Sequence, residues 1–424
     1  MIYTTKSVVK YDFLIIGLYF VLITCGWLSI YSSTHSEGSL LFQFEGIHGK
    51  QLLWMLLSLG LIFVLLNIEA KFYERFSSII YVVGILGLAL LFVFGKKISG
   101  ATSWYSFGSF SLQPTEFAKF ATALALSKWV SQMNVSLKRL KHVIISFVLL
   151  GIPAVLIIAQ PDPGSALVYA CFLIPMYREG LSFWWIFSGF ALAILFISTL
   201  YFGIIPVIIF CFIALLLHFV FINKKRKYRF QKPPSKLYYI VLFLFCATFL
   251  SSTDYIFEEI LEDRHRDRIN LVLGKIEDTQ GKGYNTMQSV IAIGSGGLTG
   301  KGFLQGTQTK GGFVPEQETD YIFTNIGEEW GFLGSMFVVL LFCVFIIRLC
   351  IIAERQKTVF TRVYAYSVAS IFFFHFLINI GMVIGIFPTI GIPLPFFSYG
   401  GSSLWGFTIL LFILVKLDSS RLEA

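Results

Sequence analysis

Charged side chains lie at the ends of several apolar runs, where they could transfer protons or bind a charged substrate. Glu116 and Lys119 stand three residues apart on one face of an expected helix that begins near Pro114. Charges at membrane depth are costly and usually line a cavity. Five carboxylates gather just ahead of another apolar run: Glu316, Glu318, Asp320, Glu328 and Glu329.

The composition is that of a membrane protein. Of 424 residues, 56% are hydrophobic and 13% are charged, whereas an ordinary globular chain carries about 25% charged residues. This excludes a soluble enzyme, a disordered chain and a nucleic-acid-binding module. The net charge of +9 falls mostly in loops that flank apolar runs. The six cysteines all lie within apolar runs and lack the spacing of a disulfide framework or a zinc site.

Hydropathy predicts an all-α polytopic membrane protein with about twelve transmembrane helices. The charge-free stretch 181–223 is too long for one crossing and predicts a hairpin that turns near Gly203 and Pro206. Lysines and arginines of the short loops fall mainly on the side of Lys6 and Lys10, which places both termini in the cytoplasm. The expected spans are 13–34, 51–68, 77–95, 115–133, 143–159, 164–177, 182–201, 205–222, 237–253, 330–348, 363–386 and 400–416.

In this topology three polar stretches rich in Gly, Pro and Trp face outward: 96–115, the long loop 254–328 before the tenth span, and 388–403. A chain with short inner and elaborate outer loops is expected to work at the outer face. Thr319 is the expected N-cap of a helix, and this puts Asp320 in the first turn, near the membrane surface.

Each of these features also has a purely structural explanation. Glu116 and Lys119 could be an ion pair that anchors a span end, and Trp104 could be an interfacial belt residue. Glu316 and Glu318 are best explained as solvated acids at headgroup level. The glycine-rich run 294–302 fails the P-loop pattern and supports only a flexible turn with Lys301 available for an anion. The histidines lack metal-ligand spacing, and His375 is expected to be packed or cavity-lining.

Five runs resemble the SEDS proteins (shape, elongation, division and sporulation). They are 113–119, 160–167, 288–302, 318–323 and 393–403. Within the family, residues 302–309 look like the RodA branch rather than the division branch, FtsW. The resemblance covers nearly the whole chain, as a single SEDS-type membrane domain over 1–424. Family members usually have ten spans, so the surplus is assigned to an extra hydrophobic hairpin within 182–254.

The resemblance implies a peptidoglycan glycosyltransferase that polymerises lipid II at the outer face of the bacterial cytoplasmic membrane, for cell elongation and shape. It implies a class B penicillin-binding protein transpeptidase and the elongation machinery as partners. No nucleic-acid partner is expected. The resemblance leaves a divalent cation, Mg²⁺ or Mn²⁺, open as a cofactor and names no other.

The resemblance also implies roles for individual residues. The essential aspartate of the family matches Asp320, which would act as general base on the acceptor hydroxyl or orient a metal that does. The remaining substrate-binding positions are Trp104, Glu116, Lys119, Arg266, Arg268, Lys301, Ser398 and Tyr399, of which the lysines and arginines would stabilise the diphosphate. Pro163 and Tyr321 replace residues more usual in the family, Leu and Phe, and both changes are mild.

Three other functions stay open at this point. A transporter or flippase for the lipid-linked precursor could use Glu116 and Lys119 to line its path. A division-type SEDS polymerase would share the motifs. A scaffold for a partner enzyme would tolerate loss of Asp320.

Overall fold

The computed structural model describes residues 11–35, 46–98, 100–108, 110–225, 235–261, 263–273, 275 and 283–421. The chain forms two compact units, one of residues 1–181 with 284–424 and one of residues 182–283. The larger unit carries all the candidate site residues except Arg266 and Arg268, which lie in the smaller unit.

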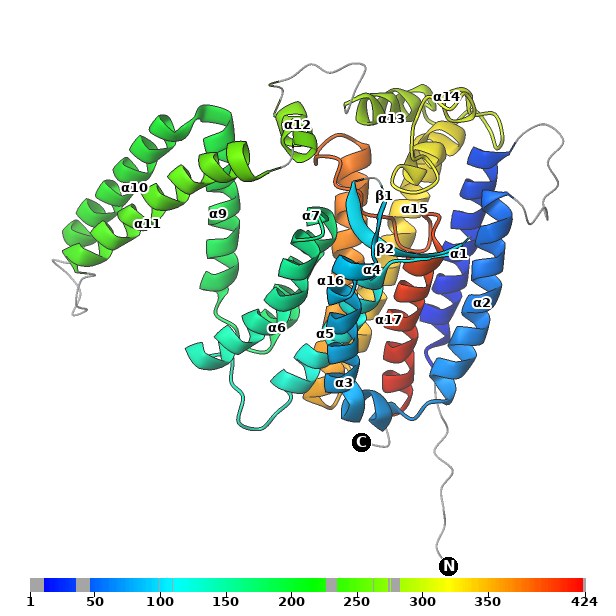
Figure 1. Cartoon of the computed structure of the whole chain (residues 1–424), viewed down its shortest axis with the longest axis horizontal. Helices are drawn as coiled ribbons and strands as arrows, with labels where there is room; N and C mark the ends of the chain where they lie inside the picture. Colours follow the sequence, from blue (N-terminus) through cyan, green and yellow to red (C-terminus); the bar gives the residue numbers. More distant parts are fainter. Residues whose placement is uncertain are drawn as a thin grey trace, which may run out of the picture. The chain divides into compact units, whose positions relative to one another are not determined.

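The larger unit is a helical bundle with one small sheet (Figure 1). Its first half comprises α1 (Phe13–Thr34), α2 (Ile47–Asn67), α3 (Ala70–Ala89), α4 (Leu91–Phe94), β1 (Lys96–Ile98), β2 (Ala101–Phe107), β3 (Phe110–Leu112), α5 (Pro114–Val130), α6 (Leu140–Ile158), α7 (Pro163–Leu167), the 3-10 helix η1 (Val168–Phe172) and α8 (Leu173–Arg178). Its second half comprises α13 (Tyr284–Ser295), α14 (Thr307–Lys310), α15 (Ile322–Glu354), α16 (Val359–Val383) and α17 (Gly401–Ser419).

Helix α5 lies inside this bundle and packs against α3, α6, α16 and α17. Its sequence is rich in buried small residues, among them Ala118, Ala121 and Ala123, and small residues let helix backbones approach closely. The approach is tight on two sides. A Cβ added at Gly84 of α3 would lie 3.2 Å from Ala121 Cβ, and one added at Gly406 of α17 would lie 3.0 Å from Glu116 Cβ.

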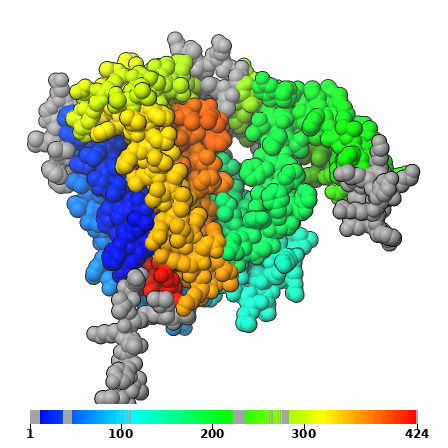
Figure 2. All heavy atoms as spheres, turned by 180° about the vertical axis from the view of Figure 1, so that it is seen from behind, coloured from blue at the N-terminus to red at the C-terminus, as the bar shows by residue number. Residues whose placement is uncertain are grey.

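The long helix α15 packs against α1, α13 and α16, and α17 packs against α2 and α5. The back face shows α15 running beside α1 and α16 (Figure 2). Most of α16 and α17 is buried, although both are apolar enough to cross a membrane. They therefore form the inner layer of the bundle, next to α5.

The described residues contain ten helices long and apolar enough to cross a membrane, so the expected count of twelve is corrected. The two other expected spans differ in kind. Helix α5 has only 17 residues, and its charges lower its hydropathy. The stretch 164–177 is divided into α7, η1 and α8, with Pro175 inside the last piece. Both segments pack against α6 and α16. Because they are enclosed by other helices, they do not need a continuous apolar surface that faces lipid.

The stretch 96–115, which is expected to face outward, contains a small antiparallel sheet in the order β1-β2-β3, which the all-α expectation did not include. Trp104 on β2 is paired with Lys96 on β1. Tyr105 and Ser106 are paired with Leu112 and Ser111 on β3. The hydroxyl of Tyr105 donates to Gly87 O of α3 at 2.8 Å, and the amide of Thr102 donates to Gln160 O at 3.2 Å. The sheet is thus fixed to the end of the bundle where α5 begins.

The smaller unit comprises α9 (Phe183–Phe202), α10 (Ile204–Lys225), α11 (Lys236–Tyr255), the π-helix η3 (Ile256–Ile260) and α12 (Asp263–Val272). The predicted turn near Gly203 is confirmed, since this residue has φ 83° and separates α9 from α10. Helix α10 packs against both α9 and α11. The three spans expected between 182 and 254 are thus found as helices, and the assignment of two of them to an extra hairpin stays a prediction. The expected loop 254–328 contains helices α12, α13 and α14.

An ionic cluster fastens three helix ends together. Asp12, the N-cap of α1, accepts from Arg348 Nη2 at 2.6 Å and from Arg355 Nη2 at 2.8 Å. Arg355 Nε also donates to Asp418 Oδ1 of α17 at 2.8 Å. Burial opposes ionisation of Asp12, but the hydrogen bonds from Arg348, Ile15 N–H and Arg355 outweigh it and hold the pKa of Asp12 below its usual value.

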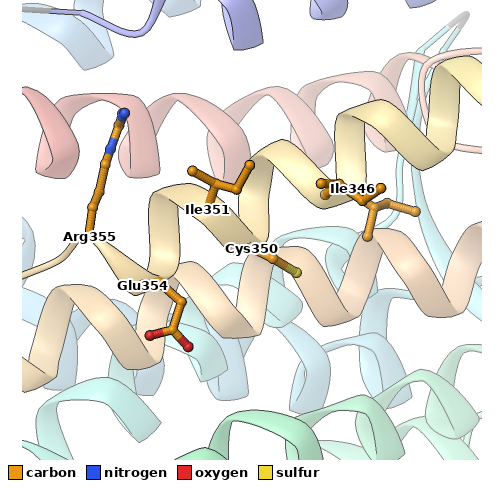
Figure 3. A pocket seen from close by; sticks show the side chains of 6 residues that line it. Ile346, Cys350, Ile351, Glu354 and Arg355 are labelled. Atoms are coloured by element: carbon orange, nitrogen blue, oxygen red, sulfur yellow. The ribbon is translucent and has the colours of Figure 1, made fainter.

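A shallow apolar groove follows the same end of α15 (Figure 3). It is lined by Ile346, Ile347, Cys350, Ile351, Glu354 and Arg355. The residues of this groove lie 24 to 33 positions after Ile322, where α15 begins, which is about 36–50 Å of helix at ~1.5 Å per residue. The groove therefore belongs to the end of α15 opposite the Asp320 turn.

Replacing Asp12 by Asn is expected to destabilise the protein by about 1–3 kcal/mol, because the hydrogen bonds that this buried side chain accepts from Arg348 and Arg355 are weakened. Since the pKa of Asp12 is lower in the folded than in the unfolded chain, its stabilisation persists above the ordinary value of 3.8 and is lost as the pH falls below it. Thermal unfolding in detergent between pH 3 and pH 7 measures both effects.

The matched control is Glu354→Gln, in an exposed ion pair with Arg178 near the same helix end. Exposed pairs contribute little, so this variant should unfold like the wild type. Equal destabilisation by the two variants would contradict the role assigned to Asp12.

Candidate active site

Asp320 lies in a tight turn directly before α15. The amides of Thr319 and Tyr321 both donate to Glu316 O, at 3.2 and 3.1 Å, and Glu316 has φ 56°. The helix begins at Ile322 with Tyr321 as N-cap, two residues later than the expected N-cap Thr319. A carboxylate just ahead of a helix is favoured by the partial positive charge of the helix N-terminus.

The backbone of this turn is held at three successive carbonyls. Asn379 Nδ2 of α16 donates to Asp320 O at 2.8 Å. Ser398 Oγ donates to Thr319 O at 2.5 Å, and the amide of Tyr399 donates to Glu318 O at 2.7 Å. The turn is therefore fixed by α16 and by the segment that follows it, here called the α16–α17 loop, residues 384–400.

The Asp320 side chain itself is half-buried. Its Oδ2 atom lies 3.4 Å from the position that a Cβ would take on Gly391, which has φ 78°. A larger residue at 391 would be strained by its backbone conformation and would press on the carboxylate. Glycine at 391 thus keeps the space beside Asp320 open.

Glu116 and Lys119 form a buried ion pair, as their spacing predicts. Lys119 Nζ lies 2.8 Å from Glu116 Oε1, and the two side chains are 4% and 3% exposed. The same ammonium lies 3.0 Å from His375 Nε2 of α16 and 4.8 Å from the centre of the Phe407 ring. Lys119 is therefore surrounded by one carboxylate, one imidazole and one aromatic face.

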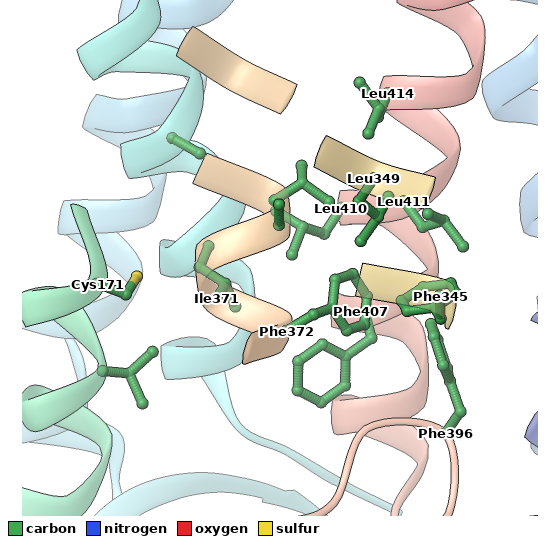
Figure 4. Packing of buried hydrophobic residues seen from close by; sticks show 14 of the residues in the cluster. Cys171, Phe345, Leu349, Ile371, Phe372, Phe396, Phe407, Leu410, Leu411 and Leu414 are labelled. Carbon is green, nitrogen blue, oxygen red and sulfur yellow. The ribbon is translucent and has the colours of Figure 1, made fainter. Parts of the chain in front are cut away.

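Phe407, which contacts Lys119, belongs to an aromatic cluster in the core (Figure 4). The ring of Phe372 lies 5.4 Å from that of Phe407 and 5.2 Å from that of Phe396 in the α16–α17 loop. Phe345 of α15 adds a third contact to Phe372 at 5.0 Å. The loop is therefore packed into the core and positioned by it.

The α16–α17 loop lies between the Glu116–Lys119 pair and the Asp320 turn. His375 Nδ1 lies 3.2 Å from Pro393 O, and Asn379 Nδ2 donates to Ile392 O at 2.8 Å. His375 and Asn379 are four residues apart, so they lie on one face of α16. One helix face thus contacts both Lys119 and the Asp320 turn, which are 201 positions apart in the sequence.

The other motif segments contact the same loop or the helix ends that flank it. Ser402 Oγ accepts from the amide of Gln113 and donates to Ser111 O, each at 3.1 Å. A Cβ added at Gly164 would lie 2.4 Å from Ile390 O. Ser289 Oγ of α13 donates to Val383 O, directly before the loop, at 2.9 Å. All five runs that carry the family resemblance therefore converge around residues 383–402.

Tyr399 belongs to the α16–α17 loop, and Trp104 lies on β2 of the small sheet. Burial raises the pKa of the Tyr399 phenol, so at neutral pH it stays protonated and can donate a hydrogen bond. Trp104 is half-buried on the sheet that leads into α5. Its place in the wall of the site stays a prediction.

Lys301 is already engaged by the protein. Its Nζ donates to Glu328 Oε1 at 2.6 Å and to Thr307 Oγ1 at 2.7 Å. Glu328 also accepts the amide hydrogens of Thr307, Gln308 and Thr309 at the start of α14. The ammonium therefore neutralises a buried carboxylate, and contact with a diphosphate would have to share it.

The glycine-rich run 294–302 accepts hydrogen bonds from amides that a break in α15 leaves without helical partners. Gly331 has φ 63° and ψ −157°, which interrupts the helix. The amides of Phe332 and Leu333 donate to Gly297 O and Leu298 O instead, at 2.9 and 3.1 Å. A Cβ on Gly300 would lie 2.1 Å from Glu329 O, so these glycines allow direct backbone contact. This explains a motif that spacing alone left as a flexible turn.

Arg266 and Arg268 belong to α12 of the smaller unit. Arg266 pairs with Asp263 and its Nη1 donates to Glu258 O at 2.9 Å. Within the described part of the chain, no three His, Cys, Asp or Glu side chains are placed to hold a metal ion together. The role of a divalent cation stays a prediction.

Sequence reasoning missed the part played by His375 and Asn379. The signal was available, because two polar residues four apart in an otherwise apolar span must share one face and need partners inside the protein. Glu316 is exposed, as expected for a solvated acid, whereas Glu328 and Glu329 are buried.

Comparison with known proteins identifies the family of the chain. The sequence model of the FtsW, RodA and SpoVE family, described as "Cell cycle protein", matches residues 12–235 and 234–423. The chain is 31% identical to "Peptidoglycan glycosyltransferase RodA" of Treponema pallidum (strain Nichols), covering 98% of this chain and 99% of that one. It is 33% identical to "Peptidoglycan glycosyltransferase MrdB" of Escherichia coli (strain K12), covering 82% and 80%.

The fold is also found in a solved structure described as "Structural coordination of polymerization and crosslinking by a peptidoglycan synthase complex". The TM-score is 0.69 at 24% identity, covering 98% of this chain and 99% of that one. The matched family model spans nearly the whole sequence, and all five motif runs meet at one place in the fold. The chain belongs to the FtsW/RodA/SpoVE family, the SEDS proteins, and within it is RodA-like.

Proposed function

We propose that this chain, a peptidoglycan glycosyltransferase like its relatives, polymerises lipid II into glycan strands with Asp320 as general base. One observation carries the proposal. The turn that bears Asp320 is held at three successive carbonyls, while its carboxylate stays half-exposed beside Gly391. A general base needs this combination of a fixed position and access to a proton.

The reaction transfers a sugar from a lipid diphosphate to an acceptor hydroxyl. As the acceptor oxygen forms its bond to the anomeric carbon, its proton passes to the Asp320 carboxylate, and the bond from that carbon to the diphosphate oxygen breaks. The diphosphate leaves as a weak base, so it needs positive charge more than a proton donor. Lys119 and Lys301 are the cations of the larger unit proposed for that task, and the same role for Arg266 and Arg268 of the smaller unit stays a prediction from the family resemblance.

Lys119 stands apart among these cations because it is almost wholly buried between Glu116 and His375. In this arrangement its contribution is a fixed positive charge and an anchor for α16, rather than direct contact with the diphosphate. Ser398 acts through the backbone of the Asp320 turn. Tyr399, as a protonated phenol, can donate to a sugar or diphosphate oxygen.

We further propose that the chain works at the outer face of the bacterial cytoplasmic membrane, beside a class B penicillin-binding protein that crosslinks the new strands. The ten apolar helices support a multi-pass membrane protein. The fold match to a structure described as a peptidoglycan synthase complex supports the partner.

Asp320→Asn is expected to lower the polymerisation rate at least ~100-fold, because the amide cannot accept the acceptor proton. The measurement is glycan-strand formation from labelled lipid II by the purified protein with its penicillin-binding partner. Glu316→Gln, the same change in charge four residues earlier on an exposed side chain, should keep wild-type activity.

Near wild-type activity of Asp320→Asn would refute the assignment of the base. If neither protein made strands but the wild type moved lipid II across liposome bilayers, the transporter alternative would replace the polymerase.

Lys119→Met is expected to destabilise the protein by about 3–5 kcal/mol, because Glu116 then stays buried without its counter-charge. The double variant Glu116→Gln/Lys119→Met should regain much of that stability yet remain far below wild-type activity. Thermal unfolding and polymerisation, measured on the same preparations, separate the two effects. Full activity in the stable double variant would mean that this ion pair only stabilises the first turns of α5 and has no part in the reaction.

A further inference from the structure

Two buried polar residues of α16 connect the charged groups of the site. His375 is 1% exposed and Asn379 is fully buried, within a span whose other inward residues are mostly apolar. Burying such groups is costly unless their hydrogen bonds are satisfied. The bonds they make go to Lys119, to the α16–α17 loop and to the Asp320 turn, and to no other described element.

The contacts of His375 select one form of its ring. A lysine ammonium can only donate, so Nε2, at 3.0 Å from Lys119 Nζ, must accept. Nδ1 then carries the hydrogen and donates to Pro393 O at 3.2 Å. A neutral imidazole in this tautomer satisfies both neighbours, and it links the Glu116–Lys119 pair directly to the loop backbone.

Asn379 continues the link. Its amide nitrogen donates one hydrogen to Ile392 O and the other to Asp320 O, both at 2.8 Å. Ile392 and Pro393 are adjacent, so His375 and Asn379 hold neighbouring carbonyls of the same loop. Hydrogen bonds thus connect Glu116 through Lys119 and His375 to Pro393 O, the loop backbone connects Pro393 to Ile392, and Asn379 connects Ile392 O to the backbone carbonyl of Asp320.

We propose that His375 and Asn379 are positioning residues, which fix the Asp320 turn relative to the buried Glu116–Lys119 pair. The inference rests on the proposed function, in which Asp320 takes the proton. Neither residue touches substrate. Their effect is on the placement of the base, and a displacement of ~1 Å can lower a rate ~100-fold.

Three substitutions at His375 separate its two bonds. His375→Asn keeps a donor near Nδ1 for Pro393 and loses the acceptor for Lys119. His375→Gln places an acceptor near Nε2 and loses the donor. His375→Phe keeps the ring shape, which packs edge-on against Phe407 at 4.8 Å, and loses both.

Each single variant, and likewise Asn379→Leu, should lower kcat by ~10- to 100-fold with KM within about twofold of wild type. The double variant His375→Phe/Asn379→Leu should lose less than the product of the single losses, because either change already breaks this connection.

The control is Gln356→Leu. Gln356 is a buried amide that donates to Ile352 O and to Asp418 Oδ1 at the opposite end of α15. The Gln356→Leu variant loses two hydrogen bonds, as Asn379→Leu does. Its stability should therefore fall, while kcat per folded molecule stays at the wild-type value. A fall in kcat equal to that of the α16 variants would mean that general destabilisation explains them, and would overturn the proposal.

A second readout does not depend on activity. Amide hydrogen exchange of the peptide covering residues 316–322 should speed up in His375→Phe and in Asn379→Leu, and should be unchanged in Gln356→Leu. Unchanged exchange in the α16 variants, or full kcat in them while Asp320→Asn is inactive, overturns the positioning role. Faster exchange combined with an active Asp320→Asn would instead refute the proposed function and leave the link intact.

Discussion

The buried ion pair of Glu116 and Lys119 is the constraint around which the site is arranged. Two charges removed from water are tolerated only when each finds close partners. The carboxylate and ammonium satisfy each other at 2.8 Å, and the remaining needs of the ammonium are met by His375 and the face of Phe407. Because these partners come from α16 and α17, the charge pair on α5 brings both helices to it.

This arrangement accounts for the shape of the surrounding backbone. Helix α5 can carry charge at membrane depth because small residues bring α3 and α17 against it and leave it little contact with lipid. The α16–α17 loop can be irregular because its carbonyls are paired with side chains of α16, such as His375 and Asn379. Non-helical backbone at the edge of a membrane protein is stable under this condition.

Much of this could be predicted from the sequence, for physical reasons. Long apolar helices such as α1 and α10 follow from hydropathy alone, and the ion pair follows from a spacing of three on a helix. The limits are equally physical. Hydropathy cannot distinguish a lipid-facing span from a short helix enclosed by protein, such as α5, or from a broken one, such as 164–177. The sheet around Trp104 has too few residues to show a strand pattern.

The candidate site was predictable as a set of residues but not as a network. Lys119 was identified by its spacing from Glu116, and Asp320 was singled out within a carboxylate cluster and given its role by the family resemblance. Both kinds of reasoning give positions without distances. The link between Lys119 and Asp320 depends on Ile392 O and Pro393 O, and backbone carbonyls have no signature in a sequence. The roles of Lys301 and the glycine-rich run were hidden because their partners, the Glu328 side chain and the backbone of a helix break, lie about 30 residues further along the chain.

That break at Gly331 separates two parts of α15 that a continuous helix would join rigidly. In an unbroken helix, each inserted or deleted residue rotates everything beyond it by about 100°, at ~3.6 residues per turn. Here the glycine-rich turn binds both parts, because its amides at Lys301 and Gly302 donate to Glu328 O and Glu329 O before Gly331, and its carbonyls accept from the amides of Phe332 and Leu333 after it. The angle between the Asp320 part and the membrane-crossing part of α15 is therefore set by this turn and not by helix geometry, so a change in the length of the turn would change that angle.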